Sequence, residues 1–183
     1  MTTSYSEPAR KTQQKAMSLS EAIALFESLP EVEPEEMIGC WVGEEFPTGH
    51  KMDGILKRYG WRGKHFYSLD DVHPLVFEAT LFGTLRLAPR RVFFGLSLPR
   101  AIIASPLIAN LFRLLMPVFM TTRAQARLRV TRYLNRTTAT MIYDGLPIRD
   151  AFVWLDSDTL LGAMERKGDS TPFFFLLRRA KEL

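Results

Sequence analysis

Residues 37–61 read "MIGCWVGEEFPTGHKMDGILKRYGW", and this stretch decides how the chain is expected to fold. Gly39, Trp41 and Gly43 stand at alternate positions, so they share one face if the segment is a β-strand. A large ring flanked by two glycines can lie flat along its strand or pack under another segment, and glycine also permits a sharp bend. The stretch therefore predicts a first strand that curls as a sheet closes.

The sequence around this stretch consists of short runs of aromatic, β-branched and apolar residues, separated by glycine, proline or aspartate. Such runs indicate short strands joined by tight turns. The last run, "PFFFLLRR", has no polar alternation, which indicates a strand buried on both faces. We expect about nine to ten strands, located at 37–46, 53–59, 64–69, 75–80, 83–95 (a hairpin through Ala88-Pro89), 127–133, 137–145, 151–166 (a hairpin) and 172–179.

Two segments have helical rather than strand patterns. Ser18 and Glu21 have the spacing of a capping box, and an apolar face follows them at helical period. Within residues 97–120, Ser105-Pro106 is a favourable pair for the N-cap and first position of a helix. We therefore expect an N-terminal helix and one inserted helix, which packs on the sheet or forms a lid or membrane contact.

The composition is that of one globular domain. The chain has 183 residues, 46% hydrophobic and 24% charged, which is enough for a sizeable core. A net charge of +4 does not by itself indicate nucleic-acid binding. The single cysteine, Cys40, excludes an internal disulfide and fits a reducing cytoplasm. Residues 1–17 show no apolar signal segment and are expected to be a disordered tail before one domain at 18–183.

Many short strands joined by turns favour a single antiparallel β-barrel, because closure removes exposed strand edges. A barrel of eight to ten strands can hold one small ligand in its interior. We therefore expect a mainly β protein with an apolar cavity inside the barrel.

The quoted stretch also carries a family resemblance. "GCWVG" followed by "PTGHKMDGIL" and "YGWRGKHF" resembles the small bacterial and fungal GXWXG family, over about residues 25–85. "YDGLPIRDAFVWLDSDTLLGAMERKGDSTPFFFLLRR" resembles the uncharacterised domain that usually follows it, over about residues 122–180. Members of this family have no established activity, so the resemblance implies an architecture rather than a reaction.

The Gly-x-Trp start is also similar to the first strand of the calycins, which include lipocalins, fatty-acid-binding proteins and haem-binding nitrobindins. This analogy implies a barrel for a hydrophobic ligand. Nitrobindins continue with a "GxGxYP" segment and ligate haem with a histidine late in the chain. Here "GEEFPTG" takes the place of that segment and no histidine follows His73, so we expect neither haem nor another cofactor.

Several side chains are candidates for a ligand site. Lys64 could bind a carboxylate or phosphate inside the barrel, unless it is an exposed turn lysine. Arg149 could bind an anionic head group, or belong to a turn. His50, close to Asp53, could do acid–base work or lie in a solvated turn. We assign the following ligand-binding residues, and no catalytic or metal-binding residue: Trp41, which could equally plug the core, His50, Trp61, Lys64, Phe66, Tyr143 and Arg149.

These observations favour binding of a small hydrophobic or lipid-like molecule inside the barrel. Two alternatives stay open. One is a barrel-pocket enzyme that uses His50 or an aspartate as general acid or base. The other is a peripheral membrane or protein-interaction module, which would use the 97–120 helix and the arginine run between 123 and 136. We expect no nucleic-acid partner, since no aromatic alternates with these arginines as base stacking needs. The identity of the ligand and the oligomeric state stay open.

Overall fold

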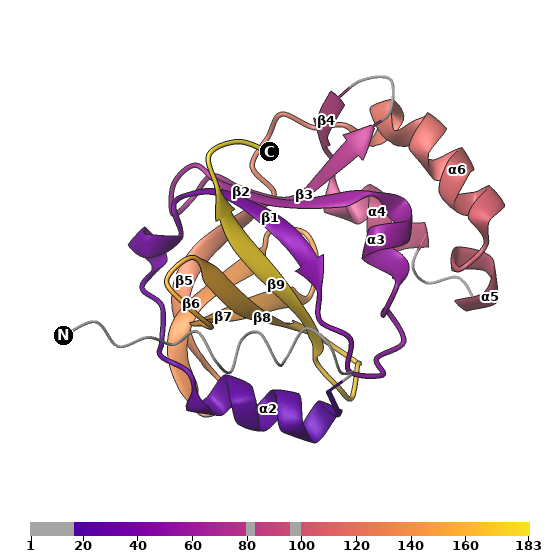
Figure 1. The fold of residues 1–183 in the computed structure, drawn as a ribbon. Helices are drawn as coiled ribbons and strands as arrows, with labels where there is room; N and C mark the ends of the chain where they lie inside the picture. The colour runs from indigo at the N-terminus through magenta and orange to yellow at the C-terminus, as the bar shows by residue number, and fades with distance from the viewer. Residues whose placement is uncertain (1–16, 80–82, 96–99) are drawn as a thin grey trace.

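The computed structural model describes residues 17–79, 83–95 and 100–183. Its nine strands form one antiparallel sheet in the order β2-β1-β9-β8-β7-β6-β5-β3-β4 (Figure 1). β2 also pairs with β3, so the first eight strands of this order close into a ring and β4 extends from it. The strands are β1 (Gly39–Glu45), β2 (Trp61–Phe66), β3 (Val72–Ala79), β4 (Gly83–Arg86), β5 (Ala126–Tyr133), β6 (Arg136–Tyr143), β7 (Ile148–Trp154), β8 (Thr159–Arg166) and β9 (Phe173–Ala180). The expected mainly β architecture of about nine strands is confirmed.

Helical segments occur before the ring and between its strands. They are α2 (Leu19–Ser28), η1 (Pro34–Met37), α3 (Ile55–Tyr59), α4 (Pro89–Gly95), α5 (Arg100–Ile103), α6 (Pro106–Leu115) and η2 (Met116–Phe119). The expected capping box is present, because Ser18 Oγ accepts from the backbone N–H of Glu21 and the Glu21 carboxylate accepts from the backbone N–H of Ser18. The inserted helix is also confirmed, as α6, with Ser105 as N-cap and Pro106 at the first position. The expected tail, apart from Met17, lies outside the described residues.

Two strand predictions are wrong. Residues 53–59 contain α3, because Gly54 and Gly60 adopt positive φ angles of 82° and 81° and bracket one helical turn. The expected hairpin at 83–95 stops at Arg86, since Pro89 begins α4, where proline is favoured in the first helical turn. The barrel therefore carries more helix beside α6 than the sequence pattern indicates.

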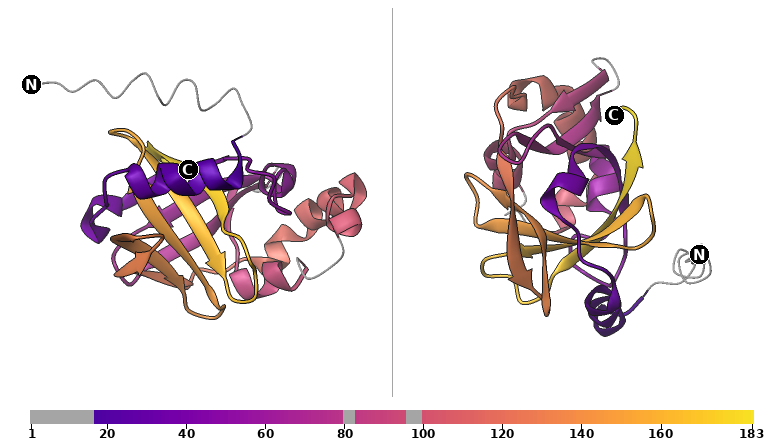
Figure 2. Two further views of the ribbon diagram at one scale, coloured as in Figure 1. Left: turned by 90° about the horizontal axis from the view of Figure 1, so that it is seen from below. Right: turned by 90° about the vertical axis from the view of Figure 1, so that its left-hand side faces the viewer.

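The core has two layers, one inside the ring and one under α2. Phe173, Phe175 and Leu177 belong to the interior cluster, while Phe174 and Leu176 pack outward with α2. Phe26 of α2 contacts Phe174 with ring centroids 6.2 Å apart. Figure 2 shows α2 crossing the outside of the strands. The prediction that this last strand is buried on both faces is confirmed.

The glycines around Trp41 create the space that its neighbours fill. A Cβ on Gly43 would lie 2.2 Å from the Trp61 ring, so this ring occupies the volume that a side chain would need. A Cβ on Gly63 would lie 1.9 Å from the Trp41 backbone oxygen, so β1 and β2 approach closely at that point. Trp41 itself is buried and its indole N–H donates to Met37 O at 2.7 Å. Gly43 thus makes room for the Trp61 ring, and Gly63 lets the backbones of β1 and β2 approach closely.

α6 and its neighbours lie on the other side of the ring from α2 (Figure 1). Among the described residues no helix is both long enough and apolar enough to cross a membrane. Phe112 of α6 contacts Tyr59 and Phe77, with ring centroids 5.1 Å and 5.8 Å apart. One face of α6 is therefore packed against α3 and β3.

Candidate functional site

A buried ion pair lies inside the barrel. Lys64 comes from β2 and Asp150 from β7, and Lys64 Nζ is 2.8 Å from Asp150 Oδ2. The two side chains are only 3% and 1% exposed. Lys64 pairs across the strands with Trp41, and Asp150 with Met141 and Met164, so these positions share the inner face of the barrel. The ring closure thus brings together two charges that are 86 residues apart in the sequence.

Three aromatic rings surround the ammonium group. Lys64 Nζ lies 5.5 Å from the ring centroid of Trp61, 5.9 Å from that of Tyr143 and 5.0 Å from that of Phe175. These distances allow cation–π attraction, which strengthens when the cation is desolvated. The Pro74 carbonyl accepts a long hydrogen bond of 3.4 Å from the same ammonium. Lys64 is therefore held by a carboxylate, a carbonyl and the faces of aromatic rings.

Burial dominates the electrostatics of the site. Burial raises the pKa of the Asp150 carboxyl, although the Lys64 charge and its hydrogen bond act in the opposite direction. Burial also raises the pKa of the Tyr143 hydroxyl well above its usual range, and the Asp150 charge adds to this effect. The site therefore disfavours negative charge, except where Lys64 balances it.

Two polar atoms of the site have no hydrogen-bond partner among the described residues. They are the indole nitrogen of Trp61 and Oδ1 of Asp150. A buried donor or acceptor without a partner costs about 1–3 kcal/mol. The indole N–H can donate to an acceptor on a small molecule that reaches the core, and Asp150 Oδ1 can accept from a donor on it.

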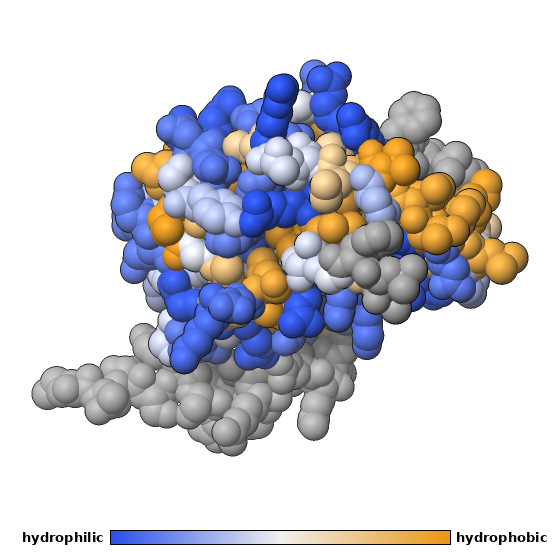
Figure 3. Space-filling model, turned by 90° about the horizontal axis from the view of Figure 1, so that it is seen from above, coloured by the Kyte–Doolittle hydropathy of each residue, from blue (hydrophilic) through white to orange (hydrophobic). Residues whose placement is uncertain are grey.

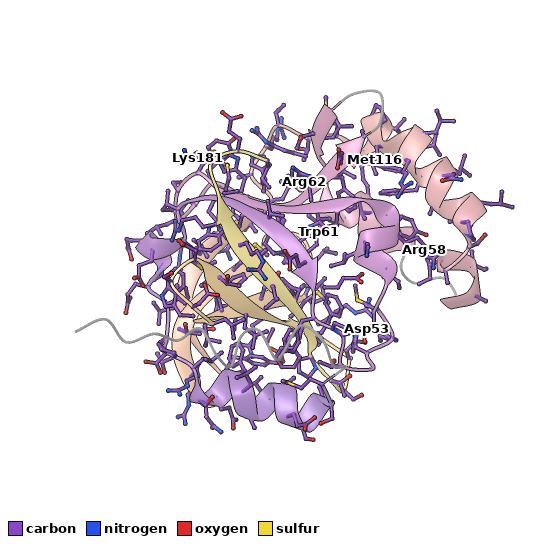
Figure 4. All side chains as sticks on the ribbon, in the orientation of Figure 1. Asp53, Arg58, Trp61, Arg62, Met116 and Lys181 are labelled. Atoms are coloured by element: carbon purple, nitrogen blue, oxygen red, sulfur yellow. The ribbon has the colours of Figure 1, made fainter. Side chains whose placement is uncertain are left out.

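The structure brings four of the seven assigned residues together. Trp61, Lys64 and Tyr143 form the site described above. Phe66 belongs to the same interior cluster, and its ring contacts Phe152, which in turn contacts Phe175. Trp61 comes from the start of β2 and is labelled in Figure 4.

The other three residues make different contacts. Trp41 is buried in the interior cluster as the cross-strand neighbour of Lys64, and the Arg179 guanidinium lies 4.3 Å from its ring centroid. Arg149 is the neighbour of Asp150 on β7 and therefore points to the outer face, where it pairs with Glu165. His50 lies in a turn and packs on Phe173 with ring centroids 5.4 Å apart. Each of these residues already has its own protein contacts.

The expected His50–Asp53 acid–base pair does not form a hydrogen bond. His50 Nδ1 accepts from the Met52 backbone N–H at 3.2 Å. Asp53 Oδ2 accepts from the backbone N–H groups of Thr48 and Gly49. Both side chains therefore stabilise their own turn, as aspartate commonly does.

Asp150 and Phe175 complete the site, and neither was assigned from the sequence. Asp150 stands at the middle of "IRDAF", where it shares its strand face with Ile148 and Phe152. The sequence did contain a signal, because Asp150 alternates with apolar residues that face the interior of the barrel. The turn-rich surroundings of "YDGLPIRD" obscured it.

The pKa values of the three histidines determine how the free energy of unfolding is expected to depend on pH. Burial lowers the pKa of His50, His65 and His73 below the usual value. On acidification the unfolded chain binds protons before the folded one does, so the free energy of unfolding falls as the pH drops below about 6.5. Urea unfolding at pH 7.5 and 5.5 measures this difference.

The variant His50→Gln isolates one contribution to this pH dependence. It is expected to lose less stability between pH 7.5 and 5.5 than the parent does. Asp150 acts in the opposite sense, because its raised pKa stabilises the folded chain at low pH, and the comparison between variants cancels that contribution. An unchanged difference in the variant would contradict the assignment to His50.

A hollow on the outside of the barrel contains the single thiol. It is lined by residues of β1 to β4 and the chain end, including Cys40, His65, Arg86 and Lys181. Cys40 Sγ lies 3.4 Å from His65 Nε2. Burial raises the pKa of the Cys40 thiol, which therefore stays protonated and weakly nucleophilic. Among the described residues, no group of three or more histidine, cysteine or acidic side chains could hold a metal ion.

Comparison with known proteins identifies two regions of the chain. Residues 24–80 match the GXWXG protein family, and residues 124–179 match a domain of unknown function, DUF4334. No curated protein matches the sequence. A solved structure, a protein from Thermomonospora curvata, is similar over 96% of this chain and 98% of its own, with a TM-score of 0.68 and 24% identity. That likeness shows a shared fold. Residues 24–80 are thus similar to the GXWXG family and residues 124–179 to DUF4334, in that order along the chain.

Proposed function

We propose that the barrel core binds a small, mostly apolar molecule that carries one acidic or hydrogen-bond-accepting group. The group would lie at Lys64 and the Trp61 indole. An acidic group would bind there with the Asp150 carboxyl protonated, because two carboxylates and one ammonium would leave a net negative charge in the core. The observation that supports this proposal is the Lys64–Asp150 pair, which is buried among aromatic rings in the middle of the barrel.

The energetics of this pair favour a functional role. Burying two charges costs several kcal/mol per ion, and well-packed apolar side chains of similar volume are often at least as stable. A gain in stability alone therefore does not explain why two charged side chains are buried here. Ionisable groups with shifted pKa values, such as Asp150, also cluster at functional sites.

The chemistry of the site defines the kind of ligand. Lys64 can donate to a carboxylate or phosphate oxygen, and the Trp61 indole N–H can donate to a second acceptor. The surrounding rings would contact the apolar part of the ligand. Trp61 is 8% exposed, against 5% for Tyr143 and 2% for Phe175, so it is the ring of the three nearest to the surface. We infer that a ligand enters by displacing the Trp61 ring.

Binding is tested with the purified protein in two ways. Native mass spectrometry would detect a retained small molecule. Urea unfolding would then be measured with a panel of small aromatic and aliphatic carboxylates, because a ligand that binds only the folded state adds about 2.7 kcal/mol at 100 times its dissociation constant. Absence of a retained molecule, together with no stabilisation by any member of the panel, would count against the proposal.

Trp61→Phe separates the hydrogen bond from the packing. It keeps an aromatic ring in place and removes the indole donor, so we expect the affinity for a panel ligand to fall about five- to tenfold. Trp154→Phe is the matched control, because Trp154 is partly buried and packs near Trp41 and Arg179 rather than at Lys64. Calorimetric titration of both variants measures the difference. Equal losses in the two variants would show that Trp61 donates nothing to the ligand.

An enzyme of the barrel-pocket type is the second candidate. The observation in its favour is the raised pKa of Asp150, which is what a general acid or base in an apolar site needs. Chemical identification of a panel ligand after long incubation distinguishes the two functions. Recovery of the ligand unchanged supports binding alone, and conversion that Asp150→Asn abolishes supports catalysis.

We also propose the cytoplasm as the compartment of the protein. The support is the single cysteine, Cys40, which is a free thiol. Thiol labelling of Cys40 in unlysed and lysed cells tests this proposal, and labelling before lysis would contradict it.

A further inference from the structure

The outer face of α6 is an exposed apolar stripe that continues into η2. Leu107, Leu111, Leu114 and Val118 follow one another at spacings of four, three and four residues, which places them on one side of a helix. Their exposed fractions are 79%, 51%, 66% and 66%. Figure 3 shows the extended hydrophobic surface at this end of the molecule. Exposed leucines normally occur singly, so a stripe of this kind indicates an interaction surface.

The opposite face of α6 is apolar as well, and it is already buried. Ala109 is 3% exposed, and Phe112 packs against Tyr59 and Phe77 as described above. Met116, which follows the helix, is fully buried. The anchoring of α6 on the barrel therefore does not use the outer stripe. α6 therefore has two apolar faces, and the barrel covers only one of them. An exposed apolar face of this extent indicates a surface that binds protein or membrane.

The charge near the stripe favours an anionic partner. Residues 79–122, the segment that carries α4, α5, α6 and η2, contain no aspartate or glutamate and five arginines. Arg91 donates to the Val118 carbonyl at 3.0 Å, which places a guanidinium at the edge of the stripe. Arg113 donates to the Arg58 carbonyl at 2.7 Å, which joins α6 to α3. Guanidinium groups of α4 and α6 thus lie near the apolar surface.

A basic hollow lies directly beside the stripe. It has a volume of about 360 Å³ and runs between α3 and α6, where Lys57, Arg58 and Arg113 line it together with Asn110. Figure 4 labels Arg58 on the side of α3 that faces α6. Three cationic side chains around an open hollow can bind phosphate oxygens.

We propose that α6 binds the surface of an anionic membrane. The leucine stripe would insert among the acyl chains, and the cations of the α3–α6 hollow would contact lipid phosphates. α6 has ten residues and is about 15 Å long, whereas the apolar core of a bilayer is about 30 Å thick, so the helix lies in the plane of the surface. A second copy of this chain would instead bring two such cationic surfaces together, which disfavours it as the occupant. The proposal does not depend on a ligand in the barrel.

Vesicle flotation with the full chain tests the insertion of the stripe. The double variant L107Q/L114Q removes two exposed leucines and keeps a residue type with similar helix propensity. It is expected to lose at least about tenfold in affinity for vesicles of phosphatidylcholine and phosphatidylserine. The matched control is I38Q/V130Q, which removes two exposed apolar side chains outside α6 (37% and 51% exposed) and is expected to bind like the parent.

Lipid charge and salt test the basic hollow. Lys57→Gln is expected to weaken binding to the same vesicles about fivefold, as is usual for one surface cation near an anionic membrane. Equal binding of the parent to pure phosphatidylcholine vesicles, or no loss at 0.5 M salt, would overturn the proposal. Failure of the parent to bind any of the vesicles would also overturn the proposal. So would a dimer of the parent in solution that the L107Q/L114Q substitutions dissociate.

Discussion

Replacing Lys64 by methionine is expected to lower the free energy of unfolding by about 3–5 kcal/mol. The substitution removes the cation but leaves Asp150, which is 1% exposed, without its partner 2.8 Å away. The carboxyl must then be protonated or remain charged in an apolar environment, and both states are costly. Chemical denaturation at pH 7 measures the loss.

The double variant Lys64→Met with Asp150→Leu separates the charge effect from the packing effect. Because it removes both ions and keeps the core filled, it is expected to regain most of the stability, or even to exceed the parent. A double-mutant cycle over the two positions should therefore give a coupling energy of several kcal/mol. If the double variant is as unstable as the sum of the single variants, the two side chains do not act as a pair.

The same double variant tests what the pair is for. A folded protein with an apolar core is expected to lose affinity for carboxylates, since it has lost the cation that binds them. Stability regained together with binding lost would show that the pair serves recognition rather than folding. Unchanged binding would place the ligand elsewhere.

The sequence predicted β9 and the start of α2 correctly, because neighbouring residues within one element determine both. The apolar run of β9 has no polar alternation, and the structure buries its phenylalanines on both faces. Ser18 and Glu21 likewise predicted the start of α2, because a capping box needs only four successive residues. In each case the signal lies within one element.

Short apolar runs were ambiguous where glycine conformation decides the outcome. "GILKRY" has aromatic and β-branched residues and reads as a strand, yet Gly54 and Gly60 adopt positive φ angles and enclose α3. Periodicity alone cannot separate a short strand from one helical turn. The packing of α3 on α6 then supports the helical form.

The ion pair could not be predicted because it depends on closure of the ring. β2 and β7 are not neighbours in the sheet, and Lys64 meets Asp150 only across the barrel interior. The sequence assigned Trp61, Lys64 and Tyr143 to a ligand site, but it gave no register between their strands. Asp150 was therefore not predicted as the partner of Lys64, although its alternation with Ile148 and Phe152 placed it on the inner face of the strand.

Gly63 is the second position at which a substitution is expected to have a large effect on the free energy of unfolding, because the backbones of β1 and β2 approach closely there. Gly63 lies in β2 opposite Val42 of β1, with φ at +150°. In Gly63→Ala the new Cβ would lie 1.9 Å from the Trp41 backbone oxygen and 2.9 Å from the Gly43 nitrogen, and backbone atoms cannot turn aside as a side chain could. We expect a loss of about 4 kcal/mol or more in the free energy of unfolding, from roughly 1–3 kcal/mol of conformational strain and a similar amount of overpacking.

Gly39→Ala provides the matched control, because it separates strain from contact. Gly39 also has a positive φ, of +128°, and it lies in β1 at the start of the same pair of strands. A Cβ there meets nothing within 4 Å, so the cost is limited to strain, about 1–3 kcal/mol. The difference between the two variants in urea unfolding thus reports the contact between β1 and β2 alone. Equal losses would mean that the strands separate at no cost, and Gly63 would then be needed only for its backbone conformation.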